Sequence, residues 1–396
     1  MANGLPLEGI RVLDLTQVQL GPCATQVLGD FGAEIVKVER PGAGDLSRST
    51  DPFIAEPSGQ SAYFMALNRN KRSLAIDLGK SEGREIVLEL ARRADVLVHN
   101  FRPGVVDRLG LDYASLQALN PRLVYASGSG FGPDGPLVHK AGQDLLAQSM
   151  SGLASRNAGE DGAPRLFPTA IGDFTAGMIL AQGVLLALYQ RERTGQGACL
   201  QVCLLDTLLA MQQQEATQWM LRRRPVNWIT QNLIDIFQTR DGAVTLVGVF
   251  RPNPLQIVCE ALGIDDLSRR PEYATLALQM ENRASLWREL GAGFARYTTA
   301  ECVERLDRAD ILCAPVLTLD EALKHPQVEA NDILVSFEHP VHGTVRTTGN
   351  PLNFSGIEQI ALRPAPTLGQ HSEEVLRELG IAPERIATLR AAAVIN

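Results

Sequence analysis

The aspartate at position 173 has the sequence context of a reactive carboxylate. It follows the turn-like segment PTAIG and directly precedes the longest apolar helical segment, residues 174–192. Aspartate at such a place is typical of a helix N-cap, whose side chain accepts amide hydrogen bonds from the first turn. The same helix N-terminus would keep the Asp173 carboxylate ionised and available as a nucleophile. Both interpretations stay open here. Asp144, which begins a helix in GQDLLAQ, is a second and structural candidate.

Cationic side chains stand near the ends of successive predicted elements, at Lys37, Arg40, Lys71, Arg72 and Arg108. Each alone is typical of solvated surface charge. Open α/β sheets bind ligands near such edges, so the group together favours a phosphate-bearing ligand. The whole chain carries 37 Lys and Arg against 45 Asp and Glu, a net charge of −8. That charge would repel nucleic acid and anionic lipid, so neither is an expected partner.

Other reactive patterns argue against several classes of protein. The first strand-to-helix turn, LTQVQLGPC, holds one glycine rather than the G-x-G-x-x-G of a dinucleotide site. His339 and His342 in HPVHG are spaced like metal ligands, but their context favours a turn. No G-x-S-x-G elbow is present. The six cysteines form no Cys-x-x-Cys pair and are predicted to be reduced and buried. We therefore expect no metal and no permanently bound cofactor.

The elements that must position these residues alternate between strand and helix. Strand-like segments occupy residues 10–15, 34–39, 95–101, 122–127 and 199–204. Helical segments occupy residues 22–33, 81–94, about 104–119, 174–192 and 205–221. This alternation predicts an α/β fold with a parallel sheet covered by helices on both faces.

The 396-residue length and a change of texture near residue 228 predict more than one folding unit. We predict a large domain over residues 1–205, completed by 336–396, and a small domain over 228–325. A linker helix at 206–227 and a return linker at 326–335 would join them. Strands are expected at 243–250, 333–337 and 343–347, and a helix at 371–379.

The N-terminal segment MANGLPLEGI lacks the features of a signal peptide. The most apolar segment, residues 176–190, is interrupted by Gln182 and Gln190. We therefore predict neither export nor a membrane span, and a cytoplasmic location.

Several segments, in order along nearly the whole chain, resemble the family III CoA-transferases, a group that includes formyl-CoA transferases and α-methylacyl-CoA racemases. They are LEGIRVLDLTQVQLGP, GAEIVKVERPGAGD, NRNKRSLAIDL, ADVLVHNFRPGVVDRLGLDY, LNPRLVYASGSGFG, IGDFTAGM, HPQVEANDI and APTLGQHSEEVLRELG. The resemblance implies a Rossmann-like large domain whose parallel sheet is built from both chain ends, plus a smaller α+β domain. It also implies an interlocked, ring-like homodimer.

The resemblance further implies that Asp173 and Gln19 are catalytic. Acyl-CoA would be a substrate rather than a resident cofactor. The implied CoA-binding residues are Gln19, Leu20, Arg40, Ile76, Asp77, Leu78, Asn100, Phe101, Arg102, Arg108 and Lys140, to which the pattern of cations adds Lys71 and Arg72. The expected reaction moves CoA from an acyl-CoA, succinyl-CoA being one candidate, to a free carboxylic acid. It would pass through an aspartyl mixed anhydride and an aspartyl-CoA thioester.

Two departures from the family's branches are informative. The racemase branch carries a histidine thirty residues before its aspartate, where this chain has Gln143. Glutamine cannot remove a proton, so racemase activity is disfavoured, and Gln143 could instead donate a hydrogen bond to a substrate carboxylate. Formyl-CoA transferases carry a glycine run that RRRPVNWITQNL lacks, which disfavours oxalate as acceptor. Arg222 to Arg224 are then anion contacts or exposed charge. A racemase and a noncatalytic CoA-binding protein remain the alternatives.

Overall fold

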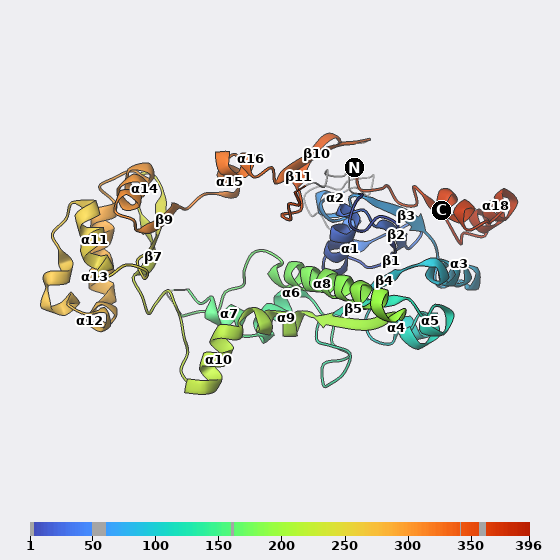
Figure 1. Ribbon diagram of the computed structural model, residues 1–396, viewed down its shortest axis with the longest axis horizontal. Helices are drawn as coiled ribbons and strands as arrows, with labels where there is room; N and C mark the ends of the chain where they lie inside the picture. The colour runs from blue at the N-terminus through green and yellow to red at the C-terminus, as the bar shows by residue number, and fades with distance from the viewer. Residues whose placement is uncertain (1–3, 50–60, 160–161, 341, 356–361) are drawn as a thin grey trace. The chain divides into compact units, whose positions relative to one another are not determined.

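The computed structural model describes residues 4–49, 61–159, 162–340, 342–355 and 362–396. The chain divides into two compact units (Figure 1). The first unit comprises Met1–Gln212 with Asp332–Asn396, and the second comprises Gln213–Asn331. The first unit therefore includes both ends of the chain.

A six-stranded parallel sheet forms the centre of the first unit, in the order β3-β2-β1-β4-β5-β6. The strands are β1 (Arg11–Leu15), β2 (Glu34–Glu39), β3 (Lys71–Ala75), β4 (Val96–His99), β5 (Val124–Ser129) and β6 (Ala198–Cys203). The predicted α/β class is confirmed. The strand order reverses between β1 and β4, and sheets of this topology bind ligands at the carboxyl ends of the strands beside such a switch point.

The prediction that both chain ends contribute to the sheet is wrong. All six strands lie between residues 11 and 203. The C-terminal segment instead forms helices α17 (Ser372–Glu378) and α18 (Pro383–Ala391), whose apolar residues pack onto one face of the sheet. Its nearest approach to sheet pairing is an isolated bridge from Ile395 to Ile76.

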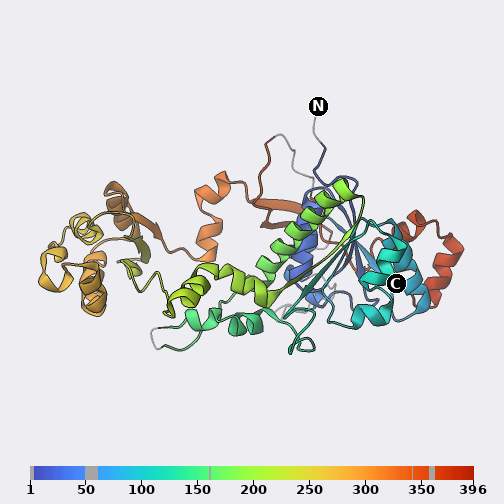
Figure 2. The same cartoon turned by 60° about the horizontal axis from the view of Figure 1, so that its bottom comes forward.

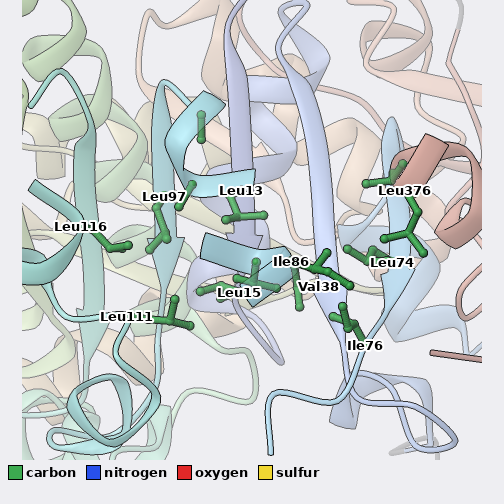
Figure 3. Packing of buried hydrophobic residues seen from close by; sticks show 14 of the residues in the cluster. Leu13, Leu15, Val38, Leu74, Ile76, Ile86, Leu97, Leu111, Leu116 and Leu376 are labelled. Atoms are coloured by element: carbon green, nitrogen blue, oxygen red, sulfur yellow. The ribbon is translucent and has the colours of Figure 1, made fainter. Parts of the chain in front are cut away.

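Alternate strand residues bury two separate faces, as the two-residue period of a strand requires. On one face, Leu13, Leu97 and Leu74 pack with α3 (Ser81–Arg93), α5 (Tyr113–Leu119) and α17 (Figure 3). On the other face, Val12, Val96 and Val98 pack with α1 (Leu20–Asp30) and α8 (Ile171–Thr194). Figure 2 shows the long helix α8, in green, lying along this face. A sheet covered on both faces positions its strand ends rigidly.

Helix α8 is apolar enough, over its length, to span a membrane, with a mean hydropathy of 1.6 over an 18-residue window. It packs against α1, β5 and β6, and its residues Leu180 and Val184 are completely buried. Leu186 and Tyr189, on another side of α8, are exposed. The packing therefore accounts for part of its apolar character and leaves one apolar side uncovered within this chain.

Two predicted helices are each divided in the structure. The segment predicted over 104–119 forms α4 (Val105–Leu109) and α5, because Gly110 adopts a left-handed conformation with φ of 67°. Asp112 then caps α5 by accepting the N–H of Ser115. The segment predicted over 205–221 forms α9 (Leu204–Met211) and α10 (Gln213–Arg222). A left-handed glycine therefore divides the first helix, and the second is interrupted at Gln212.

The remaining elements of the first unit are short. They are the helices α2 (Ala62–Leu67), α6 (Asp144–Met150) and α7 (Leu153–Arg156), and the antiparallel pair β10 (Leu334–His339) and β11 (Gly343–Thr348). Four of the six cysteines are buried as predicted, whereas Cys199 is exposed and Cys313 is half-buried.

The second unit has a small antiparallel sheet, β7-β8-β9, formed by β7 (Ile234–Gln238), β8 (Ala243–Val247) and β9 (Leu312–Pro315). Only the middle strand was predicted from the sequence. The helices of this unit, besides α10, are α11 (Pro254–Leu262), α12 (Leu276–Glu281), α13 (Arg283–Phe294), α14 (Thr299–Arg308), α15 (Leu319–Leu323) and α16 (Pro326–Ala330). Phe237, Phe294 and Leu246 are among its core residues.

Buried ion pairs lie inside the first unit, beneath α1. The Lys71 ammonium lies 3.1 Å from Asp14 Oδ2, and neither side chain is exposed. Lys71 also donates hydrogen bonds to Thr25 Oγ1 and Asn68 Oδ1. Burial would raise the pKa of Asp14, but Lys71 and Lys37 hold that pKa well below its ordinary value. Each charge is therefore compensated by its neighbours.

Replacing Lys71 with methionine should lower the free energy of unfolding of this unit by about 3–5 kcal/mol, because Asp14 would remain as an uncompensated buried charge. Urea unfolding, monitored by circular dichroism, measures the change in the free energy of unfolding. The matched control is Arg92→Met, which removes an exposed pair with Glu89 and should cost at most about 1 kcal/mol. Equal effects of the two substitutions would contradict this account of the Lys71 pair.

Candidate active site

A cavity of about 380 Å³ opens at the carboxyl edge of the sheet, beside the switch point between β1 and β4. The loops that follow β1, β4 and β5 form most of its wall, together with the first turn of α8. The lining residues are Gln17, Val18, Gln19, Leu20, Leu46, Asn100, Phe101, Arg102, Pro103, Val105, Gly128, Ser129, Gly130, Phe131, Gly132, Leu137, Val138, Lys140, Gly142, Gln143, Asp173 and Leu204. The cavity therefore brings together residues from distant parts of the chain.

Asp173 lies in the first turn of α8 and is not its N-cap. The helix begins at Ile171, three residues earlier than predicted, and Ala170 is the N-cap residue. The interpretation of Asp173 as a capping residue is therefore wrong, because its own backbone is already helical. Its side chain is free of that role and lines the cavity.

The hydrogen bond that a cap would supply comes from Asp144 on α6. The backbone N–H of Asp173 donates to Asp144 Oδ2 at 2.8 Å. The other oxygen, Oδ1, accepts from the Gln148 amide at 2.6 Å, and Gln148 Oε1 accepts the N–H of Phe167 at 2.9 Å. Asp144 and Gln148 thus tie the turn before α8 to α6.

The pKa of Asp173 is raised to about 7, first by burial and second by the negative charge of Asp144. Burial and the Asp144 charge therefore outweigh the helix N-terminus, which was expected to keep this carboxylate ionised. Asp144 accepts the first-turn amide, and its charge opposes a second charge nearby. Asp173 consequently changes its protonation state near neutral pH.

Gly177, one turn after Asp173, allows α8 to approach α1 closely. A Cβ atom at position 177 would lie 2.6 Å from the carbonyl oxygen of Leu20 and 2.7 Å from Cys23 Cβ. Only glycine permits this contact without displacing one of the two helices. The close approach brings the first turn of α8 to the start of α1, where Gln19 and Leu20 lie.

The turn between β1 and α1 is held by a separate partner at each of its residues. Lys37 Nζ donates to the carbonyl oxygen of Thr16 at 2.7 Å. The Asn100 side chain accepts from the N–H of Gln17 at 2.8 Å and donates to its carbonyl oxygen at 2.7 Å. These contacts come from β2 and from the loop after β4, so two neighbouring strands fix the start of the turn.

The second half of the turn is held in the same way. Asp45 Oδ1 accepts the N–H of Val18 at 3.0 Å, and the Tyr63 hydroxyl donates to Gln19 Oε1 at 2.7 Å. Val18 has a φ of 67°, a left-handed conformation that a β-branched residue rarely adopts. The surrounding hydrogen bonds stabilise this conformation, which presents Gln19 to the cavity.

A buried ion pair supports these contacts. Lys37 Nζ lies 2.9 Å from Asp45 Oδ2, with both side chains completely buried. Burial would raise the pKa of Asp45, but Lys37 and the amide of Val18 lower it below its ordinary value. Asp45 therefore remains an acceptor for the turn across the physiological pH range.

The predicted site residues fall into two groups. Those that line the cavity are Gln19, Leu20, Asn100, Phe101, Arg102, Lys140, Gln143 and Asp173. Arg40, Ile76, Asp77, Leu78 and Arg108 do not line it. Arg40 and Ile76 to Leu78 follow β2 and β3, however, so they lie along the same carboxyl edge. Arg40 and Arg108 are exposed.

Two predicted ligand residues need correction. The Lys71 side chain is fully buried in its pair with Asp14, so its ammonium is inaccessible to a ligand. Arg72, at the start of β3, lies at the amino edge of the sheet, opposite the cavity. Its guanidinium pairs with Glu374 and Glu378 of α17 at 2.8 and 2.6 Å. Both cations therefore stabilise the fold.

Tyr63 and Asp45 contact the turn from segments remote in sequence and were not among the predicted site residues. Tyr63 lies in α2, a helix too short to produce an amphipathic pattern, so no periodic signal was present. The Cys23 thiol, beneath the same turn, has its pKa raised to about 12, mainly by burial. A protonated thiol is a poor nucleophile.

The histidine pair in HPVHG joins β10 to β11 as the predicted turn. The N–H of His342 donates to His339 Nδ1 at 3.3 Å. Within the described parts of the chain, no group of three His, Cys, Asp or Glu side chains is arranged to hold a metal ion. Arg222 to Arg224 are exposed in the second unit.

Comparisons with known proteins give a consistent result. A family model described as CoA-transferase family III matches residues 7–372. The succinyl-CoA:glutarate CoA-transferase of Mus musculus is 35% identical, covering 94% of this chain and 86% of the relative. The acetyl-CoA:oxalate CoA-transferase of Acetobacter aceti is 35% identical, covering 96% and 97%. The crystal structure of a CAIB/BAIF family protein from Brucella suis has a TM-score of 0.86 at 29% identity, covering 95% of this chain and 100% of that one.

Replacing Asn100 with alanine should release the turn after β1. The substitution removes both hydrogen bonds to the Gln17 backbone, each contributing about 0.5–1.5 kcal/mol. Hydrogen–deuterium exchange of the backbone amides in a peptide spanning residues 11–22 should therefore accelerate about tenfold or more, as measured by mass spectrometry. The matched control is Asn120→Ala, because Asn120 donates to the backbone of Ala91 and Ala94 instead. An unchanged exchange rate in Asn100→Ala would contradict the proposed hold on the turn.

Proposed function

The chain belongs to CoA-transferase family III and catalyses CoA transfer, as the sequence motifs predicted, and we propose that Asp173 carries the transfer as a covalent intermediate. The observation that carries this proposal is the Asp173 carboxyl, with a pKa near neutrality, on the wall of the same cavity as Gln19. A carboxylate of that basicity is ionised at slightly alkaline pH and retains nucleophilic strength.

The reaction proceeds through balanced exchanges between carboxyl groups. The Asp173 carboxylate attacks the thioester carbonyl, the C–S bond breaks, and a mixed anhydride forms with release of CoA thiolate. The thiolate then attacks the Asp173 carbonyl carbon, which releases the donor acid and leaves an aspartyl-CoA thioester. The acceptor carboxylate attacks this thioester to give a second anhydride and thiolate. Attack of the thiolate on the acceptor's carbonyl yields the new acyl-CoA and restores Asp173.

Gln19 supplies a hydrogen bond to the oxyanion that develops in each step. The Tyr63 hydroxyl donates to Gln19 Oε1, so the NH₂ end of the amide is the end that can face a ligand. Losing one such donor typically raises a barrier by about 2.7–4 kcal/mol. We therefore assign Tyr63 a positioning role, since it acts through Gln19 rather than on the substrate.

The CoA portion lies along the carboxyl edge of the sheet, from the cavity toward β3. Asn100, Phe101 and Arg102 would border the pantetheine near β4. Arg108 would contact phosphates, and Arg40 with Ile76 to Leu78 would hold the nucleotide near β2 and β3. Parallel strands place all these segments at one edge, which supports a continuous path for an extended ligand.

The donor that we propose is succinyl-CoA, and the acceptor is a second dicarboxylic acid. Arg102 and Lys140 line the cavity together with Asp173, so a second carboxylate on the acyl group would meet positive charge there. The name of the Mus musculus relative supports the same pairing. Gln143 is the proposed contact to the substrate carboxylate. Its Oε1 already accepts the N–H of Leu145, so its NH₂ group is the donor that can face a ligand.

The active form that we propose is a cytoplasmic homodimer of interlocked subunits. Leu186 and Tyr189 of α8 are 63% and 67% exposed, and Leu221 of α10 is 77% exposed. Leu186 and Tyr189 lie on neighbouring turns of α8, and apolar side chains exposed to this extent favour burial against another surface. A second copy of the chain would supply that surface.

Replacing Asp173 with asparagine should lower the rate of CoA exchange by about a thousandfold or more, because the nucleophile is lost. CoA affinity and the thermal melting temperature should stay near those of the parent. Incubating the parent with succinyl-CoA and then hydroxylamine should leave a hydroxamate on the peptide containing Asp173, detected by mass spectrometry. Asp134→Asn, which changes an exposed loop aspartate, is the control and should keep full activity.

Turnover by Asp173→Asn at the parent rate would eliminate the proposed nucleophile. Deuterium incorporation at the α-carbon of an α-methylacyl-CoA, measured in the same preparation in deuterated water, would instead support racemase activity. We expect none, because Gln143 cannot remove a proton.

A panel of carboxylic acids should reveal the acceptor class. With succinyl-CoA as donor, dicarboxylates should give a higher kcat/KM than monocarboxylates of equal chain length, because their second charge meets Arg102 and Lys140. The CoA ester products are quantified by liquid chromatography and mass spectrometry. Lys140→Met should narrow the preference for dicarboxylates, while Arg193→Met, on the last turn of α8, should not. Equal rates with both acid classes would contradict the proposed substrate pairing.

A further inference from the structure

Asp144 is a buried carboxylate, 2% exposed, that does not line the cavity and has no part in the steps above. We propose that Asp144 is a positioning residue for Asp173. It occupies the first-turn amide of α8, directs the Asp173 carboxyl to the cavity and sets the pH at which exchange begins. This inference rests on the proposed function of Asp173.

The Asp144 carboxylate is held between α6 and α8. Asp144 Oδ2 accepts the Asp173 N–H at 2.8 Å, and Asp144 Oδ1 accepts the Gln148 amide at 2.6 Å. Gly172 allows this approach, because a Cβ atom there would lie 2.9 Å from Asp144 Oδ2. Both oxygens of Asp144 are therefore held in place, from α6 on one side and α8 on the other.

Asp144 and Asp173 compete for the amides at the N-terminus of α8. An aspartate in the first turn commonly turns its carboxylate toward the amides of that turn, where the helix dipole stabilises negative charge. In this chain the amide of residue 173 is already bonded to Asp144. Asp173 therefore gains less from folding back onto its own helix, and its side chain lines the cavity.

The charges around Asp173 determine its pKa. The titratable groups near Asp173 are Cys23 from α1, Tyr63 from α2 and Asp144 from α6. Cys23 and Tyr63 have raised pKa values and carry no charge at neutral pH. Arg102 and Lys140 share the cavity wall. Asp144 is the charge that acts with burial to raise the pKa of Asp173.

The chemical consequence is a more basic nucleophile. A carboxylate with a higher pKa attacks a thioester carbonyl more readily, as Brønsted behaviour requires, provided that it is deprotonated at the working pH. A pKa of about 7 meets both conditions at slightly alkaline pH. Activity should then fall as the pH decreases below 7, because protonated Asp173 cannot attack.

The test compares pH profiles of kcat/KM from pH 5 to 9 for the parent, Asp144→Asn and Asp144→Ala. Asparagine keeps an oxygen acceptor for the Asp173 amide and removes the charge. The acid limb of the Asp144→Asn profile should move to lower pH by about one unit, and kcat/KM at pH 8.5 should stay within about threefold of the parent value. Alanine removes the acceptor as well, so kcat should fall about tenfold or more at every pH while KM for succinyl-CoA changes little.

The control is Asp206→Asn, an exposed first-turn aspartate of α9, which should leave both the limb and kcat unchanged. If Asp144→Asn does not fold, Asp144→Ser takes its place, because serine retains an oxygen acceptor without charge. An acid limb that stays at the parent value in the folded variant would overturn the electrostatic part. An unchanged kcat in Asp144→Ala would overturn the positioning part.

Hydroxylamine trapping on the same samples separates this inference from the proposed function. Absence of the hydroxamate in the parent would reject Asp173 as the nucleophile. Trapping in the parent together with an unshifted profile in Asp144→Asn would reject only the role of Asp144.

Discussion

The buried pair between Lys37 and Asp45 is the interaction on which the cavity depends. Its two members hold neighbouring residues of one turn, since Lys37 bonds to the Thr16 carbonyl and Asp45 to the Val18 amide. Val18 has a left-handed backbone, and such strain costs about 1–3 kcal/mol unless surrounding contacts over-determine it. The ion pair, with the Asn100 amide, offsets that cost. Gln19 reaches the cavity only because this turn keeps its shape.

The second constraint is the close approach of α1 and α8. Gln19 lies at the start of α1, and Asp173 lies in the first turn of α8. Gly177 brings α8 against α1, and Gly172 brings the same helix against Asp144. These two glycines near the start of α8 therefore place Asp173 between the turn that holds Gln19 and the buried carboxylate of Asp144. Burial from packing and charge from Asp144 act in the same direction, and together they raise the pKa of Asp173. Fold and reactivity consequently share the same contacts.

The local sequence pattern was enough to predict the strands of the sheet, but not which carboxylates pair with its cationic side chains. The apolar run at residues 34–39 matches β2 at both ends, and the position of Asp173 before a long helix indicated the site. Lys71 and Arg72 looked like ligand contacts because a cation in a strand gives no sign of its partner. Their carboxylates, Asp14 and Glu374, are remote in sequence. The N-cap at Ala170 was missed for a similar reason, since the oxygen that replaces a cap comes from Asp144 on another helix.

The proposed use of an aspartate rather than the nearby thiol follows from the group that the reaction transfers. A cysteine nucleophile would retain the acyl group as a thioester and release CoA, and CoA could then regain only that acyl group, because cysteine has no side-chain carbonyl carbon for the thiolate to attack. A carboxylate forms an anhydride with two carbonyl carbons, and the thiolate can attack either of them. Only attack on the protein's own carbonyl loads CoA onto the enzyme. Burial keeps Cys23 protonated, with a pKa of about 12, whereas Asp173 ionises near neutrality. The same packing that keeps the thiol protonated therefore leaves the carboxylate as the proposed carrier of CoA between two acids.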